Sequence, residues 1–361
     1  MHVLLVINSL SPGTGPFQRI IKFNKSVTVS VASLFDSQAD LEGIATQFGV
    51  DVSHVNLVGL GSNTKFNALV GLYKSVRKIK PDIIQSVHTY TDIVCVVIKY
   101  LTKIPVISFE GTLISRWTFL KKYLVIFVHS LMDAVVCVSN NTNKENSNIN
   151  YILNKVTNRR TIYNGVDIDL IDSLARNTHS ENRPITIGYT GDLKSVKNLT
   201  VLFHAFSKCY KYNNNIRLLI VGSGPEYKSL RNLAFELGID VQFTGQISRL
   251  EVFKNLNLFD IFVMPSLVEG LSESIVQAMA SKVPVIVSNI NPNKELVVHN
   301  RTGLLFQSGD SDSLEYEILR IINKEVDIEF MVDNARVFIE KNLDINDITN
   351  KYIELYKEYI R

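Results

Sequence analysis

Short apolar runs alternate with longer amphipathic segments along almost the whole chain, and this alternation restricts the fold more than any other feature. It is typical of β-α units that build parallel sheets. In the first half we expect helices over 67–78 and 91–101, among others, and strands at the apolar runs 3–7, 27–33, 83–86, 106–108 and 134–138. The pattern therefore predicts an α/β protein.

The same alternation restarts after a polar stretch at 177–183, and we place a linker between two domains in the region from 156 to 184. A chain of 361 residues is long enough for two domains. Expected strands here are 185–189, 217–221, 241–244, 261–263 and 285–287, and a further strand-like run lies at 161–163. Glycines follow several of them, so we expect the loops at one edge of the second sheet to border a ligand crevice.

The stretch 269–280, EGLSESIVQAMA, predicts a helix that starts near Ser272, directly after one of these strands. The first turn of a helix presents unpaired N–H groups that bind a phosphate or diphosphate, and Gly270 allows a ligand to approach the backbone. The carboxylate of Glu269 would repel a phosphate, but it can accept hydrogen bonds from hydroxyl groups. A ligand that joins a diphosphate to hydroxyls is a nucleotide sugar. An ordinary strand-to-helix turn with a capping serine explains the same residues.

Two further segments allow two interpretations each. The loop 11–18, with Gly13 and Gly15, follows the first expected strand and either approaches a ligand or is a plain tight turn. The segment 115–130 is compatible with lying at a lipid headgroup layer, or with a half-buried surface helix. Among its side chains are the basic and aromatic residues Arg116, Trp117, Phe119, Lys121, Lys122 and Tyr123.

Charge and apolar content exclude several classes of protein. A net charge of +3 argues against a dedicated nucleic-acid binder. The apolar segment 124–138 is interrupted by His129 and Asp133 and is too short to span a bilayer, so we expect no transmembrane helix. We expect the first ten residues to form a strand and not a signal peptide. The three cysteines lack metal-ligand spacing and are expected to be buried thiols in a reducing compartment.

Taken together and in order, the motifs of the chain resemble family 4 of the retaining glycosyltransferases, which have the GT-B fold. The resemblance covers nearly the whole length and is strongest from 162 to 306. The motifs that carry it are IYNGVD (162–167), GYTGDLKSVKNL (188–199), LLIVGSGPE (218–226), VQFTGQ (241–246), DIFVMPSLVEGLSESIVQAMA (260–280), PVIVSN (284–289), NKELV (293–297) and TGLLF (302–306).

The resemblance implies two Rossmann-like domains whose parallel sheets face each other across a cleft. Residues 1–165 would bind the acceptor, residues 166–345 would bind the nucleotide sugar, and a C-terminal helix at about 346–361 would return to the first domain. The implied reaction moves a hexosyl or N-acetylhexosaminyl group from a nucleoside diphosphate sugar, with UDP favoured, to an acceptor hydroxyl with retention. The implied setting is the synthesis of a bacterial capsule or lipopolysaccharide in the cytoplasm, at the inner face of the membrane.

The resemblance also implies roles for individual residues. Glu269 would contact donor-sugar hydroxyls, and the backbone of Gly270, Leu271 and Ser272 would approach the diphosphate. Lys197 would bind phosphate, where its charge would offset that of the leaving nucleotide without a metal ion or other cofactor. The remaining residues expected near the donor are Gly13, Gly15, Asp192, Lys194, Gly222, Gly224, Gln246 and Gln277.

Three positions depart from the family pattern. Gln277 replaces a ribose-binding glutamate, and an amide oxygen accepts hydrogen bonds without charge assistance. Asp192 replaces the arginine that partners the lysine, a charge that Lys194 could supply. Glu110, the third expected catalytic residue, stands where a histidine often lies near the donor sugar. These departures leave open a catalytically silent partner subunit, and a sugar-nucleotide epimerase of the same fold is a further alternative.

Overall fold

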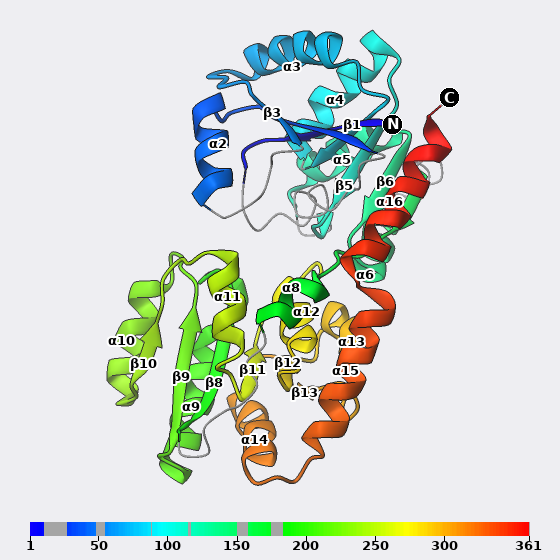
Figure 1. Cartoon of the computed structure of the whole chain (residues 1–361). Helices are drawn as coiled ribbons and strands as arrows, with labels where there is room; N and C mark the ends of the chain where they lie inside the picture. The colour runs from blue at the N-terminus through cyan, green and yellow to red at the C-terminus, as the bar shows by residue number, and fades with distance from the viewer. Residues whose placement is uncertain are drawn as a thin grey trace. The chain divides into compact units, whose positions relative to one another are not determined.

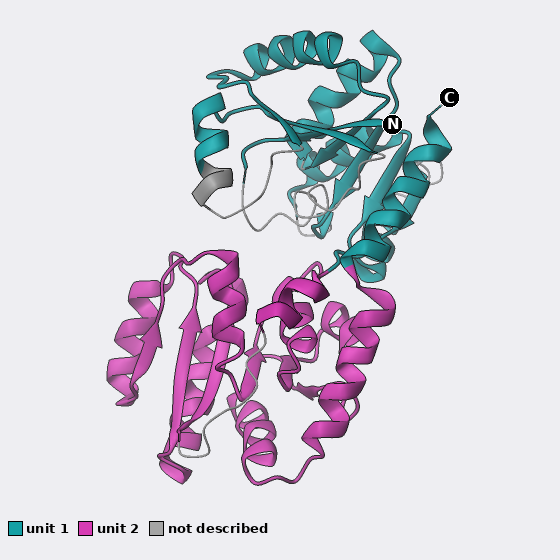
Figure 2. Ribbon diagram, viewed as in Figure 1, with its two compact units in different colours: residues 1–165, 345–361 teal, residues 166–344 magenta. Residues whose placement is uncertain are grey.

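The computed structural model describes residues 1–10, 27–47, 55–87, 89–114, 117–149, 158–174 and 183–360 (Figure 1). The chain divides into two compact units. Unit 1 contains residues 1–165 together with 345–361, and unit 2 contains residues 166–344 (Figure 2). Each unit has its own parallel sheet, so the α/β prediction and the prediction of two Rossmann-like domains are both confirmed.

Unit 1 is built on a seven-stranded parallel sheet in the order β3-β2-β1-β4-β5-β6-β7. The apolar run at the start of the chain forms the central strand, and its residues Val3 to Val6 are completely buried, as expected for a parallel strand covered on both faces. The strands are β1 (His2–Ile7), β2 (Thr28–Ser33), β3 (Val55–Gly59), β4 (Ile83–Val87), β5 (Val106–Glu110), β6 (Ala134–Cys137) and β7 (Arg159–Thr161).

The helices of unit 1 bury apolar side chains against this sheet. Ala68, Leu72 and Val76, spaced for one helical face, pack with Leu4 and Val6 of β1 in one core. Thr64 caps the same helix at its start, and Lys80 ends it in a left-handed conformation. The helices are α2 (Gln38–Gln47), α3 (Lys65–Ile79), α4 (Thr89–Thr102), α5 (Phe119–Ser130), α6 (Asn140–Ser147) and α16 (Ile345–Tyr359).

The C-terminal helix α16 belongs to unit 1, as the sequence predicts, although it follows unit 2 in the chain (Figure 2). The buried Tyr356 hydroxyl of α16 donates a hydrogen bond to Gln85 of β4. Arg160 of β7 forms an exposed ion pair with Glu358, with 3.2 Å between Nη2 and Oε2. A buried tyrosine and a peripheral ion pair thus hold α16 on the first sheet.

Unit 2 is built on a six-stranded parallel sheet in the order β10-β9-β8-β11-β12-β13. The order reverses between β8 and β11, which are neighbours in the sheet but far apart in the sequence. Ligands of open α/β sheets bind outside the carboxyl ends of the strands at such a reversal. The strands are β8 (Ile185–Thr190), β9 (Ile216–Val221), β10 (Val241–Phe243), β11 (Ile261–Met264), β12 (Val285–Ser288) and β13 (Leu304–Phe306).

Helices connect these strands, and α15 forms the end of unit 2 before the chain returns to unit 1. Arg336 of α15 is nearly buried, and its guanidinium binds Asp172 and the carbonyl of Ala280. The helices are α8 (Ile168–Leu174), the 3-10 turn η2 (Ser195–Lys197), α9 (Leu199–Tyr212), α10 (Tyr227–Leu237), α11 (Arg249–Leu256), α12 (Glu273–Ala280), α13 (Asn291–Leu296), α14 (Ser311–Ile322) and α15 (Ile328–Asn342).

The expectation that the cysteines are buried thiols agrees with the structure. Cys95, Cys137 and Cys209 are free and buried. Of the helices in the described ranges, none is long and apolar enough to cross a bilayer.

Candidate active site

An ion pair between two loops forms the centre of the site in unit 2. Lys197 ends the η2 turn after β8, and Glu269 lies in the loop between β11 and α12. The Lys197 ammonium donates a hydrogen bond to Glu269 Oε1 at 2.7 Å. Only 8% of the Glu269 side chain and 20% of the Lys197 side chain are exposed. The strand order therefore brings together two of the three predicted catalytic residues at its reversal point.

A chain of hydrogen bonds between buried residues holds the Glu269 side chain in place. The buried Ser266 hydroxyl donates to Glu269 Oε1 at 2.7 Å, and Ser288 donates to the Ser266 carbonyl at 2.5 Å. Asn293 in turn donates to the Ser288 carbonyl at 2.9 Å. The backbone N–H of Leu267 also donates to the carbonyl of Val196, which ties the two loops together. These contacts hold the carboxylate in one orientation.

Helix α12 begins directly after this loop, close to the predicted start. Ile275, Val276 and Met279 are buried, which confirms the apolar face. Ser272 occupies the N-cap position, but its buried side chain makes no capping hydrogen bond. The expected serine side-chain cap is therefore wrong, although the chain does turn from β11 into α12 here. Leu271 is buried and Gly270 is half-buried at the approach to the first turn.

The glycines that follow β8 and β9 allow two loops to pack backbone against backbone. The N–H of Leu193 donates to the carbonyl of Ser223 at 2.9 Å. A methyl group on Gly222 would lie 2.0 Å from the carbonyl oxygen of Gly191, and the φ angle of Gly222 is +136°. Close packing of the two loops thus requires glycine at these positions whether or not a ligand is bound.

We expect Gly224→Ala to destabilise unit 2 by about 1 to 3 kcal/mol, because overpacking forces the backbone to shift. Its Cβ would lie 2.5 Å from the carbonyl oxygen of Leu193. Gly43→Ala is the control, because nothing lies within 4 Å of a methyl group there and alanine favours a helix. Denaturant unfolding of both variants tests this, and a Gly224→Ala variant as stable as the wild type would disprove the packing role.

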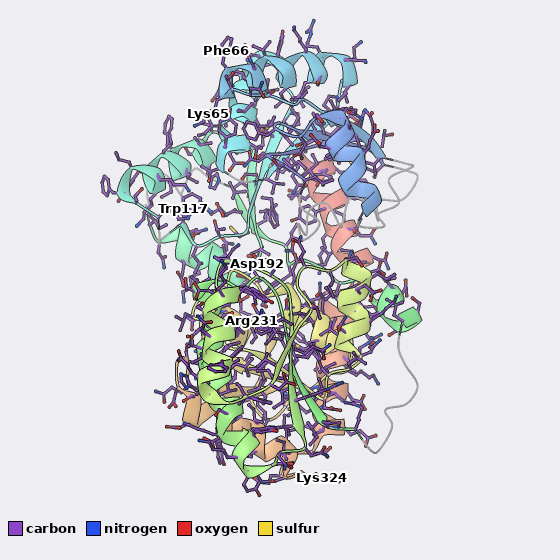
Figure 3. All side chains as sticks on the ribbon, turned by 90° about the vertical axis from the view of Figure 1, so that its left-hand side faces the viewer. Lys65, Phe66, Trp117, Asp192, Arg231 and Lys324 are labelled. Carbon is purple, nitrogen blue, oxygen red and sulfur yellow. The ribbon has the colours of Figure 1, made fainter. Side chains whose placement is uncertain are left out.

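The other predicted donor residues lie in different surroundings. Asp192, labelled in Figure 3, and Lys194 form an exposed ion pair of 2.6 Å, so the Lys194 ammonium neutralises the acid that replaces the family arginine. Gln246 is exposed after β10, and Gln277 is half-buried on α12. Gly13 and Gly15 lie outside the described residues.

The third predicted catalytic residue, Glu110, ends β5 in unit 1 and belongs to a buried polar cluster. Its Oε1 accepts hydrogen bonds from the N–H of Thr112 at 2.8 Å and from the Thr112 hydroxyl at 2.6 Å. His129 Nε2 lies 4.0 Å from Glu110 Oε2 and 3.1 Å from Asp92 Oδ2. Ser86 donates to the other oxygen of Asp92. Burial raises the pKa of Glu110, and Asp92 raises it further, while His129 and Thr112 oppose this.

We expect the contribution of Glu110 to the free energy of unfolding to decrease as the pH rises above 4.5, the ordinary pKa of this group, because the folded chain holds its proton more tightly. The stabilisation is complete below that pH and is lost as the pH passes the raised pKa. Glu110→Gln removes the titration, so its stability should depend less on pH. Glu354→Gln, on an exposed position of α16, is the control. Equal slopes for Glu110→Gln and wild type from pH 4.5 to 8 would contradict a buried, proton-holding carboxyl.

Two residues of the site were not predicted from the sequence. Ser266 donates to Glu269, and its only signal is its position within the motif at 260–280. Arg249 is half-buried at the start of α11, near Glu273 and Asp167, and burial lowers its pKa. Its Nε has no hydrogen-bond partner. Of the residues that the structure describes, no group of three or more His, Cys, Asp or Glu is placed to hold a metal ion.

Comparison with solved structures defines the class of this fold. The chain superposes on Anabaena HepE in complex with UDP-glucose with a TM-score of 0.81, at 17% identity over 99% of this chain and 100% of that one. A Rickettsia africae glycosyltransferase matches with a TM-score of 0.81, at 20% identity over 100% of this chain and 98% of that one. The fold is the GT-B fold of glycosyltransferases.

Sequence comparisons identify the family. Residues 172–340 match the model described as glycosyl transferases group 1, and residues 24–170 match the model described as Glycosyltransferase Family 4. The two models together cover most of the chain, which therefore belongs to the glycosyltransferase family that they describe, as its motifs predict.

Two named relatives have a higher sequence identity to this chain than these solved structures have. An Escherichia coli UDP-Gal:alpha-D-GlcNAc-diphosphoundecaprenol alpha-1,3-galactosyltransferase is 26% identical over 81% of this chain and 79% of its own length. The Staphylococcus aureus capsular polysaccharide biosynthesis glycosyltransferase CapM is 25% identical over 50% of this chain. That match spans 48% of CapM, about half of its length.

Proposed function

We propose that this glycosyltransferase moves a hexosyl or N-acetylhexosaminyl group from a nucleoside diphosphate sugar to a hydroxyl of a saccharide or lipid-linked saccharide, with retention. We favour UDP as the nucleotide and a cytoplasmic step of capsule or lipopolysaccharide synthesis as the setting. One observation carries the proposal: the Lys197 and Glu269 pair at the strand reversal of unit 2. It offers a cation for a diphosphate and a carboxylate for sugar hydroxyls, beside the start of α12.

The names of similar proteins support the choice of substrates. The E. coli relative is named for transfer from UDP-Gal to a saccharide joined by a diphosphate to undecaprenol. HepE was crystallised with UDP and with UDP-glucose. CapM is named for capsular polysaccharide synthesis. A UDP-sugar and a lipid-linked acceptor are consistent with all three.

In the proposed reaction, the bond between the anomeric carbon and the β-phosphate oxygen breaks, and the acceptor oxygen forms a new bond to the same carbon. The nucleoside diphosphate leaves with the bonding electrons, and the hydroxyl proton passes to the leaving phosphate. Lys197 would offset the negative charge that develops there. This cation leads us to propose that the reaction needs no divalent metal ion. The Glu269 carboxylate would orient the sugar through its hydroxyls.

The remaining predicted donor residues keep their proposed roles. The backbone of Gly270, Leu271 and Ser272 would approach the diphosphate, and Gln277 would face the ribose.

Thermal-shift measurements with UDP-, GDP-, ADP- and dTDP-sugars test donor binding. A ligand at 100 times its Kd stabilises the folded state by about 2.7 kcal/mol. For a domain of this size, that raises the melting temperature by roughly 5 to 10 °C. We expect this shift with UDP-sugars and smaller shifts with the others. If no nucleotide sugar shifts the transition, the donor site is lost and the silent partner subunit replaces our proposal.

A further inference from the structure

Helix α5 of unit 1 is apolar on both of its faces, but only one face is covered. Val125, Ile126 and Val128 are buried against the unit. On the other side Leu120, Leu124 and Phe127 follow one another at helical spacing and are 82%, 49% and 52% exposed. An apolar stripe on a helix normally packs against a core. The exposed stripe therefore indicates a surface that meets an apolar partner.

The neighbouring helix α4 extends this surface, because the two helices pack side by side. Tyr100 and Leu101, at its C-terminal end, are 56% and 60% exposed. Phe119, 72% exposed, lies at the other end of the patch, where its ring centre is 4.6 Å from that of Tyr123 and the two rings are tilted by 47°. We name the six side chains Tyr100, Leu101, Phe119, Leu120, Leu124 and Phe127 the α4/α5 surface.

The charges around the α4/α5 surface are mainly basic, and the one acid at its edge, Asp133, is paired with Lys99 of α4 at 3.0 Å. Between Asp92 and Asp133 the sequence has a single acid, Glu110, and both Asp92 and Glu110 are buried. The same segment has five basic residues. The Lys121 ammonium lies 4.0 Å from the ring centre of Trp117, which Figure 3 labels. The adjacent helix α3 adds Lys65, Lys74, Arg77 and Lys78 and contains no acid. Lys65 is labelled beside Phe66 in the same view.

The combination of apolar and basic side chains on the α4/α5 surface distinguishes between two possible partners, a second copy of the chain and a lipid bilayer. In a symmetric dimer through this surface, each copy would present its lysines to those of the other, which is unfavourable. An anionic bilayer offers phosphates to the lysines and acyl chains to the apolar stripe, and Trp and Tyr are enriched at the boundary between them. α5 has only 12 residues, which suits a helix lying in the interface plane.

We propose that the α4/α5 surface docks the protein on an anionic lipid bilayer, with α5 in the plane of the headgroups. Leu120, Leu124 and Phe127 enter the acyl region, and Lys121 and Lys122 bind lipid phosphates. Docking concerns unit 1 alone and does not depend on the proposed transfer reaction.

Flotation of the full-length protein with vesicles tests the proposal. We expect binding to vesicles of phosphatidylcholine with phosphatidylglycerol, much weaker binding to phosphatidylcholine alone, and release at high salt. The double variant Lys121→Glu, Lys122→Glu should weaken binding by roughly 30-fold or more, since each lysine contributes about fivefold. The double variant Leu120→Ser, Phe127→Ser should weaken it at every salt concentration.

Phe235→Ser is the matched control, because Phe235 is 89% exposed on α10 of unit 2 and should not affect flotation. Circular dichroism shows whether each variant folds. Transfer to a water-soluble acceptor should be unchanged in the α5 variants, which separates membrane docking from catalysis. Absence of flotation by the wild type would overturn the proposal. So would a dimer in sedimentation velocity that Leu120→Ser, Phe127→Ser dissociates, or equal flotation of the α5 variants and the wild type.

Discussion

The variant Glu269→Ala should transfer sugar at least about 100- to 1000-fold more slowly than the wild type, the usual loss when one preorganised group is removed. The carboxylate is 8% exposed and is oriented by Lys197 and Ser266. Alanine removes the acceptor of both hydrogen bonds, and with it the group proposed to orient the sugar hydroxyls. Rates of nucleotide release and of product formation measure the loss.

Glu269→Gln distinguishes charge from shape. It keeps the size of the side chain and one acceptor oxygen, so we expect an intermediate rate, between those of the alanine variant and the wild type. Glu251→Ala is the matched control, because Glu251 forms an exposed ion pair with Lys254 in the same unit. A Glu269→Ala variant with the turnover of this control would refute the role of Glu269.

Lys197→Ala should have two effects that can be measured separately. Removing one partner of a buried ion pair leaves the other charge uncompensated, which costs up to about 3 to 5 kcal/mol, and less here because Lys197 is 20% exposed. Donor turnover should also fall about 100- to 1000-fold, because the leaving diphosphate loses its cation. Thermal unfolding measures the first effect and steady-state kinetics the second.

A second substitution separates these two effects. In the double variant Lys197→Ala, Glu269→Ala no unpaired carboxylate remains, so the stability loss should be smaller than the sum of the single losses. Lys282→Ala removes a lysine from an exposed pair with Asp333 in the same unit and should change neither property. Unchanged turnover in Lys197→Ala would show that another group stabilises the leaving nucleotide.

The strands were predicted where burial alone decides the structure. Buried apolar runs such as β1, β8 and β11 lie where the sequence places them. β7 was predicted at 161–163 but spans Arg159–Thr161, because pairing with β6 selects a charged segment that has no apolar signal. β3 was not predicted, since most of its residues are only half-buried and its register comes from pairing with β2.

The sequence predicts which residues belong to the candidate site but not how they are arranged in space. Lys197 and Glu269 are 72 positions apart, and only the pairing of β8 with β11 brings their loops together. The chain of hydrogen bonds from Asn293 through Ser288 and Ser266 likewise joins three motifs that sequence spacing cannot relate. A glycine after a strand can either let a ligand approach the backbone or let two loops pack closely. The sequence does not distinguish these causes, and the packing of Gly222 against Gly191 is visible only in the structure.

The most direct test of the proposed function is a transfer assay with UDP-sugars and a synthetic saccharide-diphospholipid acceptor, followed by mass spectrometry and NMR. We expect a product one sugar heavier than the acceptor, one equivalent of UDP, and the anomeric configuration of the donor in the new linkage. Consumption of the UDP-sugar without acceptor, with release of UDP and an altered free sugar, would instead show an epimerase. A product of inverted configuration would contradict the proposed mechanism.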